Sequence, residues 1–234
     1  MPYYARRHQL TGSLIYHVFN RSATQEPIFH IEEDFQHFMD SLRGYKEKFL
    51  LKIYHWVIMN THFHILLEIA DPREISSLMA GIARAYTHYH HKIYGTRGFL
   101  WQGRFKLQPV QKERYLIACG RYIERNPVRA NIAQEAHDYP YSSARFYCKG
   151  LCDGITSQDP IHALFGLENL KRQLNYVEFL RDFNAEEEEL FNNFERPVGD
   201  EAFIRLLRKL HGRHMPQTQG RSLRIFCSQH SPNE

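Results

Sequence analysis

The sequence predicts an α+β fold, a ferredoxin-like split βαβ arrangement in which helices cover one face of an antiparallel sheet. Four segments are rich in β-branched and aromatic residues, and three others repeat apolar residues at helical spacing. The two kinds follow one another in the order β-α-β-β-α-β-α. A small helical extension is expected after them.

The first four elements are a strand, a helix and a hairpin. Residues 13–21 mix β-branched and aromatic side chains and are followed by a polar stretch that ends the strand. Residues 31–49 carry apolar side chains at helical spacing, with acidic residues where a helix N-terminus favours negative charge. Residues 51–59 and 62–69 are two further strands. They are antiparallel neighbours, because the short link between them allows only a tight turn.

Two helices and one strand complete the predicted sheet domain. Residues 74–94 have an amphipathic helical pattern that ends at Gly95. Residues 98–110 form a loop that runs into the fourth strand. Residues 113–126 form the third helix, which we expect Pro127 to end.

The character of the chain changes near Cys148, where short helical patterns begin to alternate with Gly, Asp and Pro. We therefore divide the chain into a domain at 1–147 and a C-terminal helical extension at 148–234. The extension contains a basic helix that begins after Asp200, and nucleic-acid contact and a solvated helix face explain its charge equally well. The basic stretch continues with Arg213, Arg221 and Arg224.

The composition indicates a folded, soluble protein. Apolar residues make up 43% of the 234 residues and charged residues 24%, which excludes a disordered chain. No apolar run approaches the ~18 residues of a membrane helix and no signal peptide is evident, so we expect a cytoplasmic protein with no membrane partner. The four cysteines include no CxxC pair and read as reduced thiols; Cys148 and Cys152 could begin a zinc site, but no second pair completes it. The net charge of +4 is carried by clustered arginines, which favours an anionic partner.

A pair of histidines opens the third strand. His62 and His64 lie two residues apart, so strand alternation places both imidazoles on one face, about 6–7 Å apart, while Phe63 faces the core. This spacing allows both rings to bind one metal ion. Two histidines on a partly wet sheet face are the alternative in a chain with 15 histidines.

The third helix adds a phenol and an amide. Tyr122 and Asn126 are four residues apart and share one helical stripe. Two imidazoles and one amide oxygen leave coordination positions open on the metal, so they suit Mg²⁺ or Mn²⁺ that also binds a phosphate oxygen. The Tyr122 oxygen can then attack the phosphorus of that phosphate. Tyr122 also follows Tyr115 and Cys119 at helical spacing, so a core tyrosine is the alternative, and Tyr115 is the rival nucleophile.

Arginines surround this helix and provide cationic contacts for a DNA backbone. They are Arg104, Arg114, Arg121, Arg125 and Arg129, with Arg21 at the end of the first strand. Aromatic residues are interleaved with them and can stack on unpaired bases or pack in the core. These are Trp101, Phe105, Tyr139 and Tyr141.

Several short sequence motifs occur along the chain in a fixed order. They are HVFNR at 17–21, HFH at 62–64, WQGRF at 101–105, RYIERNPVRA at 121–130, YPYSSAR at 139–145 and VGDEAFIRLL at 198–207. Together they cover most of the chain and resemble the REP-associated tyrosine transposases, which belong to the IS200-like, single-tyrosine HUH transposases. One departure is Thr61, where the family favours Asn before the first histidine.

The resemblance implies a metal-dependent, single-strand-specific DNA endonuclease and strand transferase. In the family, the HUH histidines bind a divalent metal, a helix tyrosine forms a covalent 5′-phosphotyrosine, and a polar residue four positions later completes the metal site. By motif these residues are His62, His64, Tyr122 and Asn126. The implied partner is hairpin DNA with single-stranded flanks. No nucleotide cofactor is expected, because each transesterification preserves one phosphodiester and the chain has no nucleotide-binding glycine motif.

Two other functions remain open from the sequence. One is a binding module that holds structured single-stranded DNA or RNA without cutting it. The other is a metal phosphodiesterase that uses activated water and forms no covalent adduct. A monomer and a homodimer are equally compatible with the sequence.

Overall fold

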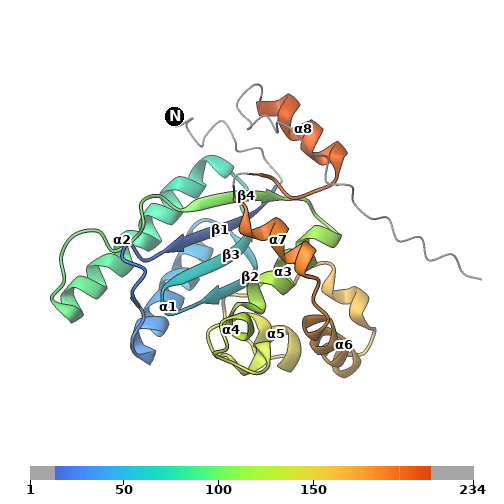
Figure 1. Ribbon diagram of the computed structural model, residues 1–234, viewed down its shortest axis with the longest axis horizontal. Coiled ribbons are helices and arrows are strands. Elements are labelled where there is room, and N and C mark those ends of the chain that lie inside the picture. The colour runs from blue at the N-terminus through green and yellow to red at the C-terminus, as the bar shows by residue number, and fades with distance from the viewer. Residues whose placement is uncertain (1–13, 195, 212–234) are drawn as a thin grey trace, which may run out of the picture.

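Four antiparallel strands form one open sheet in the order β2-β3-β1-β4 (Figure 1). The computed structural model describes residues 14–194 and 196–211. The strands are β1 (Ile15–Arg21), β2 (Lys52–Ile58), β3 (His62–Glu68) and β4 (Lys106–Val110). The tight turn predicted between the second and third strands is present, and it places β2 beside β3.

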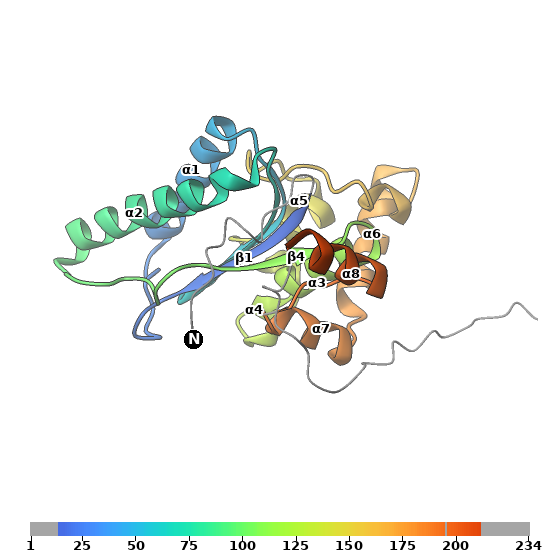
Figure 2. The ribbon, with the colours of Figure 1, turned by 90° about the horizontal axis from the view of Figure 1, so that it is seen from above.

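Two helices, α1 (Glu32–Lys48) and α2 (Ile75–Tyr94), pack together on one face of the sheet (Figure 2). The main apolar core lies between them and the strands. Phe63 and Ile65 of β3 enter this core, as does Val18 of β1, because alternate residues of a strand face the same side. This layer and the antiparallel sheet confirm the predicted α+β fold class.

The third helix departs from the single helical layer that we expected. α3 (Arg114–Glu124) packs on the opposite face, against β2, β3 and β4, and the short helix α4 (Asn126–Arg129) follows it. The physical reason is that this face is also apolar: Ile15, Val57 and Leu66 need a cover there. Pro127 interrupts the helix as predicted, but it also opens α4, where a missing N–H loses no hydrogen bond.

The C-terminal segment packs back onto α3. It contains α5 (Ala144–Lys149), α6 (Asn169–Arg181), α7 (Ala185–Asn192) and α8 (Glu201–His211). Helices α6 and α7 contact α3, and Phe191 and Val198 join the apolar cluster between α3 and the sheet. The predicted basic helix is α8, whereas Arg213, Arg221 and Arg224 lie outside the described residues.

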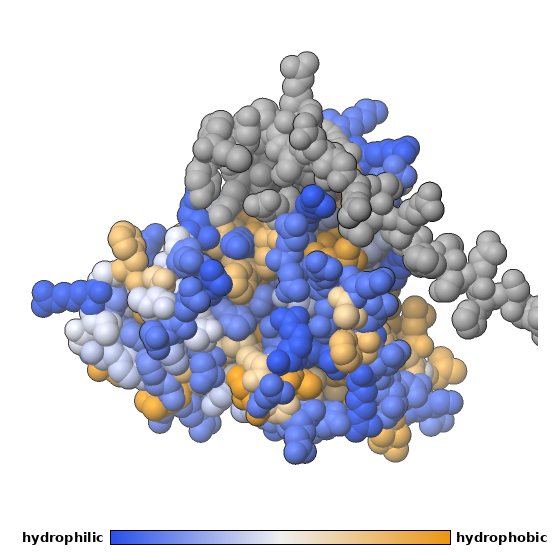
Figure 3. Space-filling view, in the orientation of Figure 1, coloured by the Kyte–Doolittle hydropathy of each residue, from blue (hydrophilic) through white to orange (hydrophobic). Residues whose placement is uncertain are grey.

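The surface seen in Figure 3 is mainly hydrophilic, and its hydrophobic groups form small separate patches. Within residues 14–194 and 196–211, no helix combines the length and apolar character needed to cross a membrane. Cys119, Cys148 and Cys152 are free thiols, and Cys227 lies outside the described residues.

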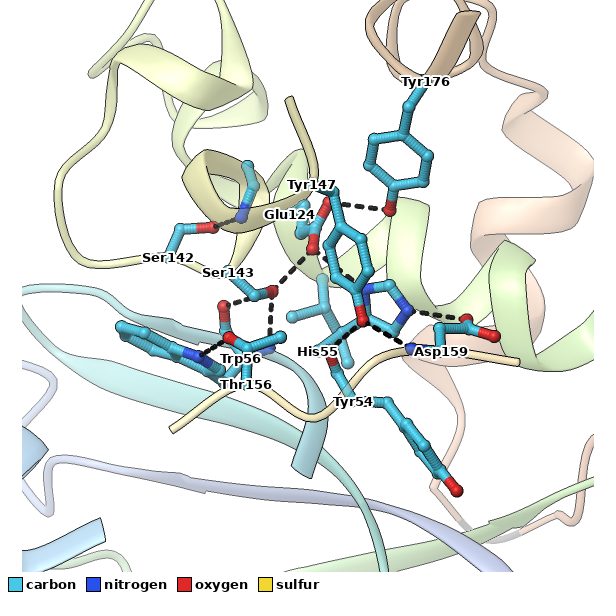
Figure 4. Close-up of polar contacts among 12 residues, drawn as sticks. Tyr54, His55, Trp56, Glu124, Ser142, Ser143, Tyr147, Thr156, Asp159 and Tyr176 are labelled. Carbon is cyan, nitrogen blue, oxygen red and sulfur yellow. Dashed lines mark hydrogen bonds and ion pairs between the residues drawn. The ribbon is translucent and has the colours of Figure 1, made fainter. Parts of the chain in front are cut away.

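A buried polar cluster joins β2, α3 and the C-terminal segment (Figure 4). His55 Nδ1 lies 2.8 Å from Glu124 Oε1 and its Nε2 lies 2.9 Å from Asp159 Oδ2. The hydroxyl groups of Ser143 and Tyr176 donate to the Glu124 carboxylate at 2.5 and 2.9 Å. Burial opposes a charge on His55, but the two carboxylates prevail and raise its pKa to about 9. The cluster therefore holds a charged imidazole against the last turn of α3.

Candidate functional site

The sheet face that α3 covers carries polar side chains at alternate positions of three strands. Cross-strand register places His17 opposite Gln108 and Phe19 opposite His64. Arg21 lies opposite His62. The period of two along each strand therefore gathers side chains from distant parts of the chain on one surface.

A cavity of about 500 Å³ opens between this surface and the end of α3. Its lining includes His62, His64, Tyr122 and Asn126, the four residues to which the sequence assigned the chemistry. A second hollow, of about 470 Å³, lies between α1 and α2 and contains none of them. The cavity on the α3 face is therefore the candidate active site.

The two histidines are held in the neutral state with defined partners. His62 Nδ1 lies 2.9 Å from the Thr61 hydroxyl, and His64 Nδ1 lies 2.8 Å from His17 Nε2. Burial lowers the pKa of His62 to about 4; the Asn126 side chain opposes this shift, and Arg129 and Arg21 add to it. Burial also lowers the pKa of His64 well below its ordinary value, and His17, His62 and Arg129 act in the same direction. His62 also interacts with the Asn126 side chain, and His64 keeps Nε2 for another partner. Thr61, which departs from the family pattern, thus contacts a candidate ligand.

Asn126 directs its amide oxygen towards the cavity. Its Nδ2 donates to the backbone carbonyls of Tyr122 at 2.9 Å and Ile123 at 3.1 Å, so the oxygen faces the opposite way, where it accepts from Arg129 Nη2 at 3.5 Å. Among the residues that the structure describes, no three His, Cys, Asp or Glu side chains gather into a metal-binding group. Two neutral imidazole nitrogens and one oriented amide oxygen nevertheless fit a divalent ion that takes its remaining ligands from substrate or water.

Tyr122 lies on the same side of the sheet as the histidines. Its hydroxyl donates to Asn192 Oδ1 at 2.9 Å, and the Arg129 guanidinium lies 4.6 Å from the ring centre. The ring meets that of His64 edge-on, with the centroids 5.6 Å apart. Burial raises the pKa of the Tyr122 phenol, and Arg129 opposes this shift. The phenol is neutral, next to the histidines, and covered by α7.

The predicted arginines divide into three groups. Arg21 and Arg129 line the cavity, and Lys106 adds a third cation that the sequence analysis missed. Arg121 and Arg125 are buried and form ion pairs with acidic residues of α7, so they are not part of an open cationic surface as we expected. The acidic partners are Glu187 and Glu188. Arg104 and Arg114 do not line the cavity; Arg114 donates to the Tyr115 hydroxyl at 2.8 Å.

The aromatic residues at the cavity also differ from the expected ones. Trp101, Phe105 and Tyr139 are buried in the core, and Tyr141 is half-buried against Phe35, which supports the packing alternative. Phe19 and Phe194 line the cavity instead. Sequence reasoning missed His17 and Gln108 as well. The signal for His17 and Phe19 was the alternation that places them on the same face of the first strand as Arg21.

Comparisons with known proteins give a matching family and a similar fold. Residues 11–126 match the family described as transposase IS200 like. The structure of a REP-associated tyrosine transposase bound to a REP hairpin is similar in fold, with a TM-score of 0.53 and 21% identity over 68% of this chain and 93% of that chain. A candidate transposase from Deinococcus radiodurans R1 aligns with 57% of this chain and 94% of that chain at 19% identity and a TM-score of 0.35. No curated protein sequence matches the chain.

Proposed function

Because the chain belongs to the IS200-like transposase family, we propose that it is a metal-dependent endonuclease and strand transferase for single-stranded DNA, with Tyr122 as the nucleophile. Membership of the family makes it a DNA-processing enzyme and agrees with the resemblance drawn from the sequence motifs. The finer proposal is that it cleaves hairpin-associated DNA through a covalent 5′-phosphotyrosine.

One observation carries this proposal: a phenol, two neutral imidazoles and an oriented amide oxygen line the same cavity. Tyr122 and Asn126 come from α3 and α4, and His62 and His64 from β3. The rival nucleophile, Tyr115, is buried and does not line the cavity. The geometry therefore favours Tyr122.

His62, His64 and Asn126 would hold the divalent ion, Mg²⁺ or Mn²⁺. The bound ion supplies Lewis acidity at the scissile phosphate. In the cleavage step the Tyr122 oxygen bonds to phosphorus and the bond from phosphorus to the 3′ oxygen breaks. The phenol loses one proton and the released 3′ oxygen gains one, so protons balance. Arg129, above the Tyr122 ring, favours the phenolate that attacks.

The proposed substrate is hairpin DNA with single-stranded flanks, in line with the REP hairpin bound by the fold neighbour. Arg21, Lys106 and Arg129 would contact backbone phosphates at the cavity. Phe19 and Phe194 would offer stacking surfaces. In this proposal residues 1–147 carry the catalytic groups, and the extension from residue 148 covers them.

The test is to incubate the protein and Mn²⁺ with a labelled hairpin that has single-stranded flanks. We expect a covalent adduct with the unmodified chain and with Tyr115→Phe, and none with Tyr122→Phe, which should still bind the DNA. Adduct that persists in Tyr122→Phe, or nucleotide recovered on the Tyr115 peptide, contradicts the assignment. Binding without any product indicates a non-cleaving module, and cleavage without adduct indicates attack by water.

A further inference from the structure

His17 lies at the centre of the sheet, between a proposed metal ligand and a glutamine. His17 Nε2 is 2.8 Å from His64 Nδ1, and His17 Nδ1 is 3.4 Å from Gln108 Oε1. His17 and Gln108 are fully buried, and His64 is 3% exposed. Three polar side chains thus form a row from β4 across β1 to β3, with the cavity at its end.

The orientation of the Gln108 amide is fixed by the C-terminal segment. Gln108 Nε2 lies 3.0 Å from the carbonyl oxygen of Leu190 and 2.8 Å from those of Asn193 and Arg196. A carbonyl oxygen only accepts hydrogen bonds, so the NH₂ group must face these three atoms. The amide oxygen therefore faces His17.

This orientation determines which nitrogen carries the proton in each ring. The Gln108 oxygen only accepts, so the proton of His17 is on Nδ1. A neutral His17 then has a lone pair on Nε2, which accepts from His64 Nδ1–H. His64 in turn keeps a lone pair on Nε2, the nitrogen left for the cavity. The opposite arrangement would bring the lone pair of His17 Nδ1 against the amide oxygen.

We propose that Gln108 and His17 are positioning residues that hold His64 as its Nδ1-protonated tautomer. The backbone carbonyls of Leu190, Asn193 and Arg196 set this arrangement by orienting Gln108. The C-terminal segment therefore takes part in preparing a histidine more than 120 residues earlier in the chain. The use of the free Nε2 as a metal ligand rests on the proposed function, whereas the tautomer itself does not.

The direct test is long-range ¹H–¹⁵N spectroscopy of the metal-free, full-length chain with ¹⁵N-labelled histidine. We expect His17 and His64 each to show a protonated Nδ1 and an unprotonated Nε2. A His64 ring protonated at Nε2 overturns the proposal, whatever the behaviour of any variant.

Two matched variants separate positioning from packing. Gln108→Leu removes the amide that faces His17. Gln111→Leu also breaks a contact between the end of β4 and the C-terminal segment, because Gln111 Nε2 donates to the Asp200 carboxylate and Gln111 Oε1 accepts from the Asp200 backbone N–H. Gln111 does not contact the histidines. We expect mixed His64 tautomers and a tenfold or greater loss of Mn²⁺ affinity in Gln108→Leu, on the order found for outer-shell partners of metal ligands. Gln111→Leu should keep the wild-type values of both quantities.

The outcomes distinguish this proposal from the proposed function. A wild-type chain that shows the expected tautomers but does not bind Mn²⁺ supports the positioning role and contradicts the metal-dependent function. Mn²⁺ binding that is equally tight in Gln108→Leu, with unchanged His64 tautomers, overturns the positioning role alone. Thermal unfolding of each variant identifies a loss of fold, in which case the wild-type spectrum decides.

Discussion

The buried charge on His55 predicts that the protein loses stability as the pH rises above 7. Burial alone would lower the pKa of His55, but Glu124 and Asp159 raise it to about 9, against 6.5 in an unfolded chain. Because the folded pKa is the higher one, the stabilisation is complete below pH 6.5 and disappears as the pH passes 9. A difference of 2.5 pKa units corresponds to about 3 kcal/mol, of which about 2 kcal/mol is lost between pH 7 and 8.5.

The assay is urea unfolding followed by circular dichroism at several pH values from 7 to 8.5. The free energy of unfolding should fall by about 1.4 kcal/mol per pH unit, the slope for one proton. His17, His62 and His64 do not obscure this slope, because their pKa values are lowered and they cost stability only as the pH falls below about 6.5. His55→Gln is neutral throughout and should remove the slope. A wild-type stability that does not change over this range would refute the charged state.

Three further results are expected. Gly120→Ala would place a methyl group 2.6–2.7 Å from the His55 ring and should lower the free energy of unfolding by about 1–3 kcal/mol. Gly44→Ala, with nothing within 4 Å, should raise the free energy of unfolding by up to about 1 kcal/mol, and equal urea midpoints for the two variants would contradict this. Arg129→Ala should weaken hairpin binding and reduce its salt slope by about 1 in fluorescence anisotropy. Arg73→Ala, at an exposed arginine that does not line the cavity, should do neither. A chain that ends after α5 exposes α3 and should show no cooperative thermal transition; a sharp one would show that the first domain folds alone.

Local patterns predicted the strands and helices well, because the periodicity of a strand or a helix depends on residues close together in the sequence. The strands predicted at 51–59 and 62–69 are Lys52–Ile58 and His62–Glu68, and the core-facing position of Phe63 is confirmed. The face that α3 covers was not predictable in the same way. Almost every residue of α3 is buried, between the sheet on one side and the C-terminal helices on the other, so its pattern names no single partner.

The site residues that were missed or misassigned from the sequence have contact partners far away along the chain. Arg121 and Arg125 were assigned to DNA because a sequence gives the sign of a charge but not its partner. The acidic residues that neutralise them lie more than 60 positions later, in a run that the sequence displays but does not place. Similarly, His17 and Gln108 become neighbours only because β1 lies between β3 and β4. Strand order, rather than strand pattern, is the missing information.

The cavity is assembled from residues at both ends of the described chain, and this determines when it forms during synthesis. Its first contributor, Phe19, is made early, and its last, Phe194, comes 68 residues after Asn126. At about 5–20 residues per second, a ribosome needs roughly 3–14 s to cover that interval. A nascent chain therefore carries its histidines and tyrosine for several seconds before the cover over them exists. The cavity is complete only after residue 194 has been made, so a shorter product carries the candidate site residues without the side chains that close the cavity.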